Sequence, residues 1–272
     1  MVDKKINDLT LEATINSTMQ LETDIGGITS NKITIEDLKT YIGTPPKITR
    51  YTAGSYTFTP DPLAKKTKIE IQAAGGSGGR LYSNYGTCSV GSGGNSGNFY
   101  SCMIEEPITT TLGVTVGGTT GTPGGNGAQG NVGAHSFFGS TQIVGGGGGI
   151  VTYGTAQAVI IASSSQPGSA INWGSLSFTE LLNITGQKGT SPWVPRQSDY
   201  GHIVGGDGGE AHWGHASRSE VAIYGGSRGG YASVNHDGSG YGYGGCGLAR
   251  GGTQGGVGNQ GGAGLTIVTE YY

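Results

Sequence analysis

The chain has 272 residues and a formal net charge of -3, and 57 residues are glycine, about three times the usual share of about 7%. Only 12% of the residues are charged, which argues against the basic stripe of a nucleic-acid-binding protein. The sequence shows no signal-peptide pattern and no apolar run of about 18 residues, so we expect neither ordinary secretion nor a membrane span.

The N-terminal part, residues 1–45, differs from the rest because glycine is sparse and aliphatic residues are spread through it. Thr34-Ile35-Glu36-Asp37 resembles a capping box, and a short helix over residues 35–42 is expected to follow. Gly43 would end that helix. We therefore predict a small N-terminal module over residues 1–45 and a linker over residues 46–54.

Strands are indicated by alternation of apolar and polar residues with a period of two. Four clear candidates cover residues 55–59, 68–73, 111–116 and 265–272. Shorter candidates cover residues 159–162, 181–184 and 203–204, of which 181–184 could also be read as helix. These strands assign residues 55–272 to one glycine-rich, mainly β domain.

Glycine recurs at every third position in two tracts of this domain. The tracts consist of Gly118, Gly121, Gly124, Gly127, Gly130 and Gly133, and of Gly252, Gly255, Gly258, Gly261 and Gly264. This period fits neither an α-helix nor a strand, but is typical of an extended helix with about three residues per turn and no internal hydrogen bonds. A stripe of glycines lets another backbone approach closely. We therefore predict packed polyglycine-II-type helices within a mainly β fold.

Two other interpretations of the glycine content are weaker. A flexible linker would not carry 14 tyrosines, 5 phenylalanines and 3 tryptophans. Collagen needs many prolines between its glycines, and Pro123 is the only proline within either tract.

The order of motifs resembles the glycine-rich domain of bacteriophage tail-fibre proteins over about 220 residues. The motifs are Ser55-Tyr56-Thr57-Phe58-Thr59, residues 69–76, 112–118, 136–139 and 145–149, and the closing stretch 261–272. The N-terminal part separately resembles a phage fibre attachment module, through residues 6–9 and 32–41.

This resemblance implies a homotrimeric fibre or fibre tip in the virion tail, made in the host cytoplasm. Residues 1–45 would bind phage tail or baseplate proteins. The C-terminal part would bind a host surface polysaccharide or outer-membrane protein, so the expected function is host adhesion by a receptor-binding protein.

Aromatic residues between the glycine tracts are the candidate receptor-binding residues. They are Tyr82, Tyr85, Trp193, Tyr200, Trp213, Tyr231, Tyr241 and Tyr243. Tyrosine and tryptophan on rigid loops give a large contact area at low entropic cost. The competing interpretation is that they cover sheet faces or pack inside an oligomer.

Other chemistry receives little support from the sequence. His212 and His215 lack a third metal ligand nearby, and we expect no metal site and no cofactor. Cys88, Cys102 and Cys246 show no metal-type spacing, and three reduced thiols are favoured over one disulfide with a free thiol.

No catalytic constellation is visible, so we expect a protein that is not an enzyme. Three alternatives remain open: a structural virion component (fibre shaft, tail or capsid decoration) without receptor contact, a capsule-degrading enzyme, and an ice-binding protein.

Overall fold

The computed structural model describes most of the chain after residue 43 and two short strands before it. The described residues are 20–23, 31–34, 44–79, 88–121, 129–154, 169–192, 200–203, 205–219, 222–225, 235–247, 249–250 and 259–272. The chain divides into two compact units, one of residues 1–46 with Tyr272 and one of residues 47–271. Among the described residues there is no helix, and the fold is mainly β. The predicted helix 35–42 lies outside the described residues.

In the first unit, the described residues form one antiparallel hairpin. Strand β1 (Gln20–Thr23) pairs with β2 (Asn31–Thr34), and Leu21 lies opposite Ile33.

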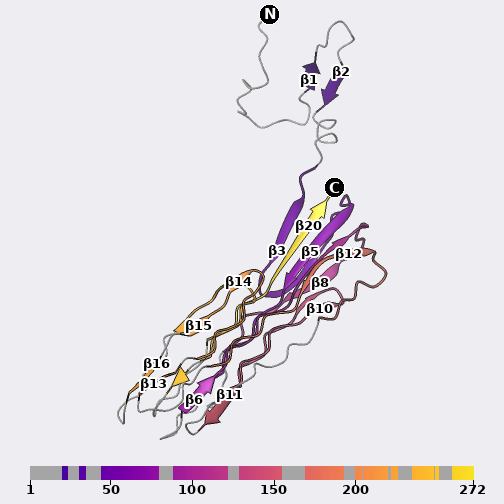
Figure 1. Cartoon of the computed structure of the whole chain (residues 1–272). Helices are drawn as coiled ribbons and strands as arrows, with labels where there is room; N and C mark the ends of the chain where they lie inside the picture. The colour runs from indigo at the N-terminus through magenta and orange to yellow at the C-terminus, as the bar shows by residue number, and fades with distance from the viewer. Residues whose placement is uncertain are drawn as a thin grey trace, which may run out of the picture. The chain divides into compact units, whose positions relative to one another are not determined.

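The second unit contains two antiparallel sheets that share a hydrophobic core (Figure 1). The five-stranded sheet has the order β12 (Phe178–Ile184), β7 (Phe99–Ile104), β5 (Lys66–Gln72), β20 (Leu265–Tyr271), β3 (Lys47–Tyr51). The four-stranded sheet has the order β10 (Thr141–Ile143), β9 (Ser136–Phe138), β8 (Leu112–Val116), β4 (Gly54–Phe58).

Alternating side chains from both sheets fill the core between them. Ile69, Tyr100 and Val268 come from the larger sheet, and Val114 and Phe138 from the smaller one, and each is at most 1% exposed. Burying a side chain of this size stabilises the fold by about 1.5–3 kcal/mol. The four clear strand predictions are confirmed as β4, β5, β8 and β20, and the strand interpretation of residues 181–184 is confirmed within β12.

The predicted linker 46–54 is wrong for residues 47–51. These residues form β3, which pairs in register with β20 from Lys47 opposite Glu270 to Tyr51 opposite Thr266. The prediction failed because β3 is an edge strand with mostly exposed side chains, so its apolar pattern is weak.

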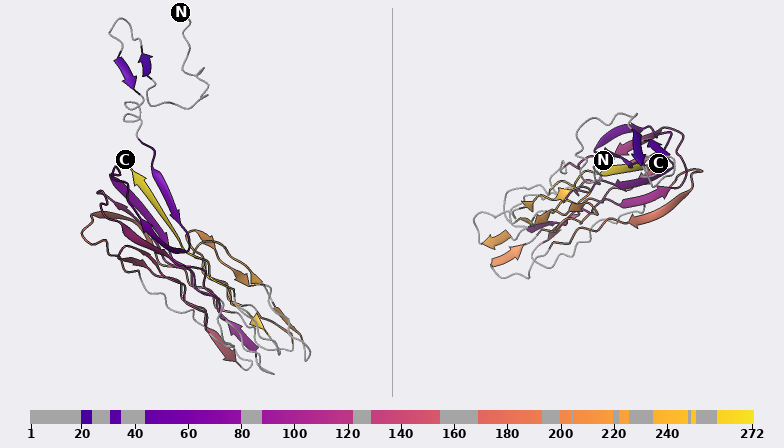
Figure 2. Two further views of the ribbon diagram at one scale, coloured as in Figure 1. Left: turned by 180° about the vertical axis from the view of Figure 1, so that it is seen from behind. Right: turned by 90° about the horizontal axis from the view of Figure 1, so that it is seen from above.

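Beyond the two sheets, glycine-rich segments run lengthwise through this unit, side by side (Figure 1, Figure 2). We call them the glycine array: residues 73–79, 91–98, 130–134, 144–150, 186–192, 205–210, 242–247 and 259–264. Apart from the first residue of 91–98, which ends β6, and an isolated bridge at Gly261, they are not assigned to strands, yet their backbones are hydrogen-bonded to one another.

The segment 73–79 lies in the middle of the glycine array, because its N–H groups point to three neighbours in turn. Residues 73, 76 and 79 donate to Asn98, Asn95 and Ser92; residues 74 and 77 donate to Ala134 and Asn131; residues 75 and 78 donate to Gly262 and Asn259. These N···O distances lie between 2.9 and 3.3 Å. The direction in which the backbone N–H groups donate therefore repeats every three residues.

Carbonyl groups of the same segment accept from further neighbours. Ala74 and Ser77 accept from Gly146 and Gly149, both at 2.8 Å. Gly76 accepts from the amide of Gly245 at 2.8 Å. Backbone groups that are buried here are thus satisfied by other segments instead of by a strand ladder.

The segment 92–98 repeats this arrangement. Its N–H groups donate in turn to segments 144–150, 187–190 and 242–245, again with a step of three residues. Two neighbouring segments thus share one hydrogen-bonding period.

Close backbone packing explains why glycine is required in the glycine array. A Cβ on Gly76 would overlap the carbonyl oxygen of Gly147, and one on Gly78 would overlap that of Cys246. In the predicted triplets, Gly130, Gly133, Gly261 and Gly264 face neighbouring backbone or buried groups in the same way.

Two of the predicted structural glycines do not meet this condition. A Cβ on Gly121 would contact nothing within 4 Å, and one on Gly118 would lie 3.9 Å from the Cβ of Ala53. Close packing therefore does not require glycine at these two positions. Gly124, Gly127, Gly252, Gly255 and Gly258 lie outside the described residues.

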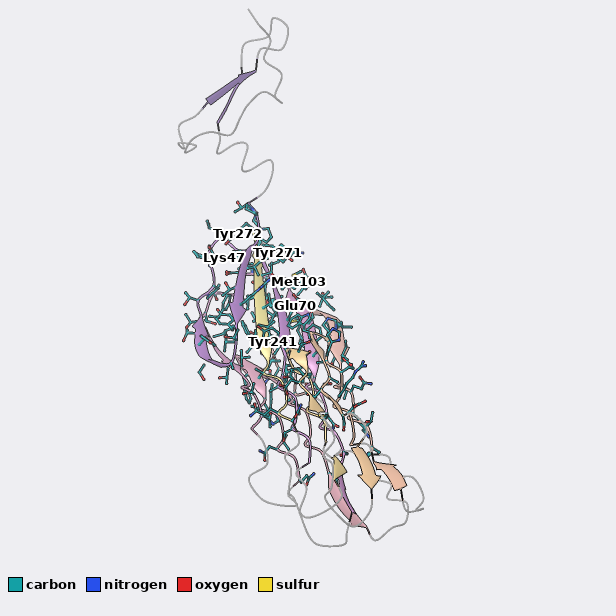
Figure 3. All side chains as sticks on the ribbon, turned by 90° about the vertical axis from the view of Figure 1, so that its left-hand side faces the viewer. Lys47, Glu70, Met103, Tyr241, Tyr271 and Tyr272 are labelled. Carbon is teal, nitrogen blue, oxygen red and sulfur yellow. The ribbon has the colours of Figure 1, made fainter. Side chains whose placement is uncertain are left out.

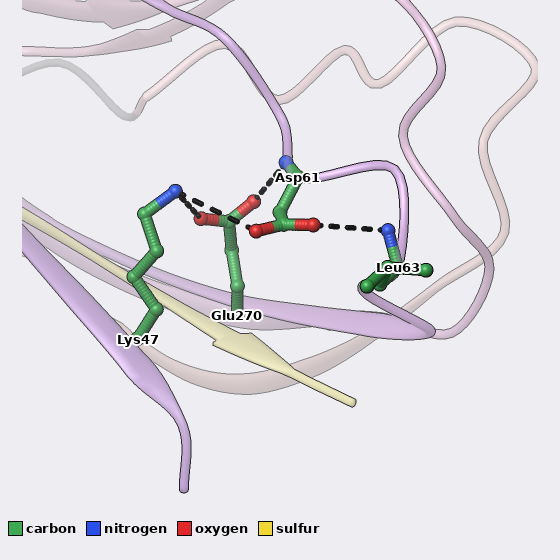
Figure 4. A network of polar contacts seen from close by, with 4 residues as sticks. All are labelled: Lys47, Asp61, Leu63 and Glu270. Carbon is green, nitrogen blue, oxygen red and sulfur yellow. Dashed lines mark hydrogen bonds and ion pairs between the residues drawn. The ribbon is translucent and has the colours of Figure 1, made fainter. Parts of the chain in front are cut away.

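An ion pair between a buried carboxylate and a half-exposed lysine holds the C-terminal strand (Figure 4). Glu270 of β20 is 1% exposed, and its carboxylate lies 3.2 Å from the Nζ of Lys47 on β3. The backbone N–H of Asp61 donates to the other Glu270 oxygen at 2.6 Å. Glu270 therefore connects β20, β3 and the loop after β4.

Candidate binding surface

Small strands at one end of the second unit (Figure 1) border in sequence the segments that carry four of the eight candidate aromatics. One sheet has the order β11 (Val151–Gly154), β6 (Cys88–Gly91), β19 (Ala249–Arg250). A second sheet pairs β13 (Tyr200–Ile203) with β16 (Ala222–Gly225). These strands lie at the far end of the glycine array from the C-terminal end of β20 (Figure 1).

Four candidate residues, Tyr82, Tyr85, Trp193 and Tyr231, lie outside the described residues. Their segments adjoin described strands at this end: 80–87 precedes β6, 193–199 precedes β13, and 226–234 follows β16. Tyr200 is the first residue of β13, where it pairs with Gly225. The short strand predicted at 203–204 is confirmed in its first residue as the end of β13, whereas 159–162 lies outside the described residues.

Trp213 lies instead beside the five-stranded sheet, where it covers the start of β7. Its ring packs edge-on against Phe99 with centroids 4.9 Å apart, and His212 lies over the same ring at 4.1 Å. Phe99 is only 1% exposed as a result. Trp213 is half-buried and covers the face of the five-stranded sheet opposite the core, since Phe99 alternates along β7 with the core residues Tyr100 and Cys102.

The turn that carries Trp213 is held by a neighbouring hairpin. Strand β14 (Gly214–His215) pairs with β18 (Ser239–Gly240), and the backbone N–H of Tyr241 donates to the Trp213 carbonyl at 2.9 Å. Figure 3 shows Tyr241 on the same side of the molecule as Glu70 and Met103.

Tyr243 lies within the glycine array, and its ring occupies the space next to Gly238 and Gly262. Burial raises the pKa of its hydroxyl, with a further contribution from Asp237. The structure thus brings Trp213 and Tyr241 together, and gives both Trp213 and Tyr243 packing contacts.

The two histidines next to Trp213, His212 and His215, contact different partners. His215 lies 3.6 Å from the carboxylate of Glu210, whereas His212 stacks on Phe99. Within the described residues, no group of three or more His, Cys, Asp or Glu side chains is arranged to hold a metal ion.

Two of the three cysteines are buried and free. Cys102 lies in β7 and Cys246 in the glycine array, and burial raises the pKa of each thiol to about 12. Neither thiol is poised for reaction at neutral pH, because only the thiolate is nucleophilic.

Small polar side chains in the glycine array carry a role that the sequence analysis missed. Ser77 Oγ accepts from the amide of Asn131 at 2.8 Å, and Asn95 Oδ1 accepts from that of Gly189 at 3.2 Å. Both side chains are fully buried. The available signal was their position, one residue after a glycine pair.

Comparison with known proteins adds no family to this description. No protein-family model matches the chain, and no curated protein matches it. No helix in the described part of the chain is long and apolar enough to cross a bilayer.

Proposed function

We propose that the chain is a phage tail-fibre or fibre-tip protein that binds a molecule on the host cell surface. The proposal is supported by the ordered resemblance of residues 55–272 to the glycine-rich domain of tail-fibre proteins, and by the separate resemblance of residues 1–45 to an attachment module.

The observation that carries the proposal is the glycine array together with the strands at its end. Segments joined to one another by backbone hydrogen bonds make a stiff support. Strands β6, β13 and β16 adjoin the segments with Tyr82, Tyr85, Trp193 and Tyr231. Aromatic residues on a stiff support bind with little loss of conformational entropy.

For the glycine array itself we infer polyglycine-II-type helices. A chain with about three residues per turn points successive N–H groups in three directions. The donors of segments 73–79 and 92–98 change neighbour in that order. This geometry supports a rigid body that needs few large side chains.

The proposed partners follow the resemblance. Three copies would form the fibre, residues 1–45 would hold the tail or baseplate, and the C-terminal part would bind a polysaccharide or outer-membrane protein. The protein would be made in the host cytoplasm and act in the virion tail. Several weak sites on one particle would then give firm attachment.

The test is binding of the labelled full-length protein to a panel of bacterial strains. Trp193→Ala and Tyr231→Ala should reduce binding to a recognised strain without changing the melting temperature. Leu63→Ala is the matched control, since Leu63 is 73% exposed on the loop after β4. Absence of binding to every strain that the parent phage infects would refute the proposal.

A second candidate is a structural virion component without receptor contact. The packing of Trp213 on Phe99 and of Tyr243 beside Gly238 and Gly262 favours it, because these aromatics already have structural contacts. In that case, Trp193→Ala and Tyr231→Ala would leave phage adsorption unchanged.

A further inference from the structure

Lys47, Asp61 and Glu270 bring one amine and two carboxyl groups together where the first and last strands of the second unit pair (Figure 4). The Lys47 Nζ lies 3.2 Å from Glu270 Oε2 and 4.0 Å from Asp61 Oδ2. The backbone N–H of Asp61 donates to Glu270 Oε1 at 2.6 Å. Both carboxyl groups are therefore held beside the same amine.

The three side chains differ in burial. Glu270 is 1% exposed, and its Oε2 is buried and accepts no hydrogen bond from the described residues. The Lys47 and Asp61 side chains are 49% and 27% exposed. A buried polar atom without a hydrogen bond is uncommon in a folded protein, and a catalytic role is one reason for it. Glu270 Oε2 is placed to accept a proton from the Lys47 amine.

The Asp61 carboxyl group is held by its other oxygen. Asp61 Oδ1 accepts from the backbone N–H of Leu63 at 3.0 Å. A donor at this position stabilises the negative charge that develops on a carbonyl oxygen when an amine attacks the carbon. Asp61 Oδ2 lies on the side of the Lys47 amine and is the oxygen that can leave.

We propose that Lys47 and Asp61 form an intramolecular isopeptide bond, with Glu270 as the proton carrier. The Lys47 Nζ gives a proton to Glu270 Oε2, and the free amine attacks Asp61 Cγ. A bond forms between Nζ and Cγ, and the bond between Cγ and Oδ2 breaks. Glu270 passes two protons in turn from Nζ to Oδ2, which leaves as water. The Glu270 carboxylate is regenerated, and no oxidant or other reactant is consumed.

The fold favours this condensation because it holds the reacting groups together. Well-oriented groups within one molecule react as if at a concentration of about 10⁵ M or more. The half-exposed Lys47 side chain leaves the water a route out. The new bond would join β3, an edge of the five-stranded sheet, to the loop after β4, an edge of the four-stranded sheet. This inference goes beyond the proposed function and does not rest on it.

The experiment is the intact mass of the purified full-length chain, unfolded in denaturant and measured by mass spectrometry. The expected mass is lower than the sequence mass by one water molecule, and a branched tryptic peptide should join Lys47 to Asp61. The branched peptide is needed because a succinimide at Asp207-Gly208 or Asp237-Gly238 would lose the same mass.

Variants separate the roles of the three residues. Asp61→Asn should still form the bond, with loss of ammonia in place of water. Glu270→Gln and Lys47→Arg should keep their sequence masses, since the first lacks the proton carrier and the second an amine that can attack. Lys66→Arg, which alters the ion pair with Glu105, is the matched control and should still lose one water.

Lys47→Arg decides the matter even if Glu270→Gln does not fold, because Lys47 is half-exposed and arginine keeps the charge beside Glu270. A wild-type chain with its full sequence mass would overturn the proposal. So would a loss of water without the branched peptide, or an equal loss in Lys47→Arg.

Discussion

The backbone N–H of Gly76 donates to the carbonyl oxygen of Asn95 at 2.9 Å, and neither residue belongs to a strand. Three residues further along, Gly79 makes the same contact with Ser92 at 3.2 Å. The two segments therefore stay in contact through hydrogen bonds that recur once per three residues. Segments held this close leave no room for a side chain at Gly76.

Gly76→Ala should unfold or strongly destabilise the protein. The added Cβ would overlap the carbonyl oxygen of Gly147, and this backbone is held by neighbours on several sides. We expect a loss of about 3 kcal/mol or more in the free energy of unfolding, measured by urea denaturation.

Gly113→Ala is the control for this change. Gly113 lies in β8, and a Cβ there would contact nothing within 4 Å. Its effect should stay within about 1 kcal/mol. Equal effects of the two variants would show that close packing does not constrain Gly76.

Lys47→Met should destabilise the protein because it leaves the Glu270 carboxylate without its cation. Glu270 is 1% exposed and lies 3.2 Å from the Lys47 Nζ. The carboxylate is buried but the Lys47 side chain is 49% exposed, so the expected loss is about 1–3 kcal/mol, the cost of a buried polar group left without its partner. Thermal denaturation measures the change.

Lys66→Met provides the comparison, since Lys66 pairs with Glu105 at 2.7 Å at an exposed site. Solvent weakens such a pair, so this variant should change the melting temperature little. If Lys66→Met were the more damaging change, the structural role of Glu270 would be wrong.

Stability should fall in alkaline solution because of the two buried thiols. Burial raises the pKa of Cys102 and Cys246 from 9.0 to about 12. Above 9.0 the unfolded chain releases protons that the folded chain retains, so the free energy of unfolding decreases as pH rises towards 12. Below 9.0 this contribution to stability is fully present.

Urea denaturation from about pH 7 to about pH 11 tests this dependence. Cys102→Ala and Cys246→Ala should each have a flatter profile than the wild type. Burial of Tyr100, whose pKa is also raised to about 12, should leave a remaining slope in both variants. Identical profiles in all three proteins would contradict the assignment.

Trp213→Ala should lower stability by about 1–3 kcal/mol, because it uncovers Phe99. Trp213→Phe retains an aromatic ring and should recover most of the loss. Calorimetry on both variants measures the difference. A Trp213→Ala protein with wild-type stability would instead fit a loop residue that is free to contact a receptor.

The sequence predicted strands well where one face is buried and the other exposed. Alternation identified β4, β5, β8 and β20. Strand β7 was not predicted from the sequence. Four consecutive residues in it, Phe99, Tyr100, Ser101 and Cys102, are buried, so the strand lacks the alternation with a period of two.

The glycine period predicted packed extended segments, but not which glycines are in contact. Segments near the centre of the glycine array carry pairs of glycines, as in Gly75-Gly76-Ser77-Gly78-Gly79, and not only single glycines at every third position. With neighbours on several sides, two positions in three lack room for a side chain, and the third takes a small polar group such as Ser77. Which segments become neighbours depends on the fold, so spacing alone could not supply it.

Other features depend on contacts between distant parts of the chain. A charged residue such as Glu270 is ordinarily exposed, and nothing in its neighbourhood marks it as buried. Likewise, a tryptophan such as Trp213 beside glycine is equally suited to an exposed loop or to covering a sheet face.

Hydrogen exchange, followed by mass spectrometry on the native full-length protein, tests the central claim of a hydrogen-bonded glycine array most directly. Peptides covering residues 73–79 and 92–98 should exchange as slowly as the strand β5, because their amides are bonded to neighbouring segments. Exchange of these peptides at the rate of an unfolded chain would contradict the account.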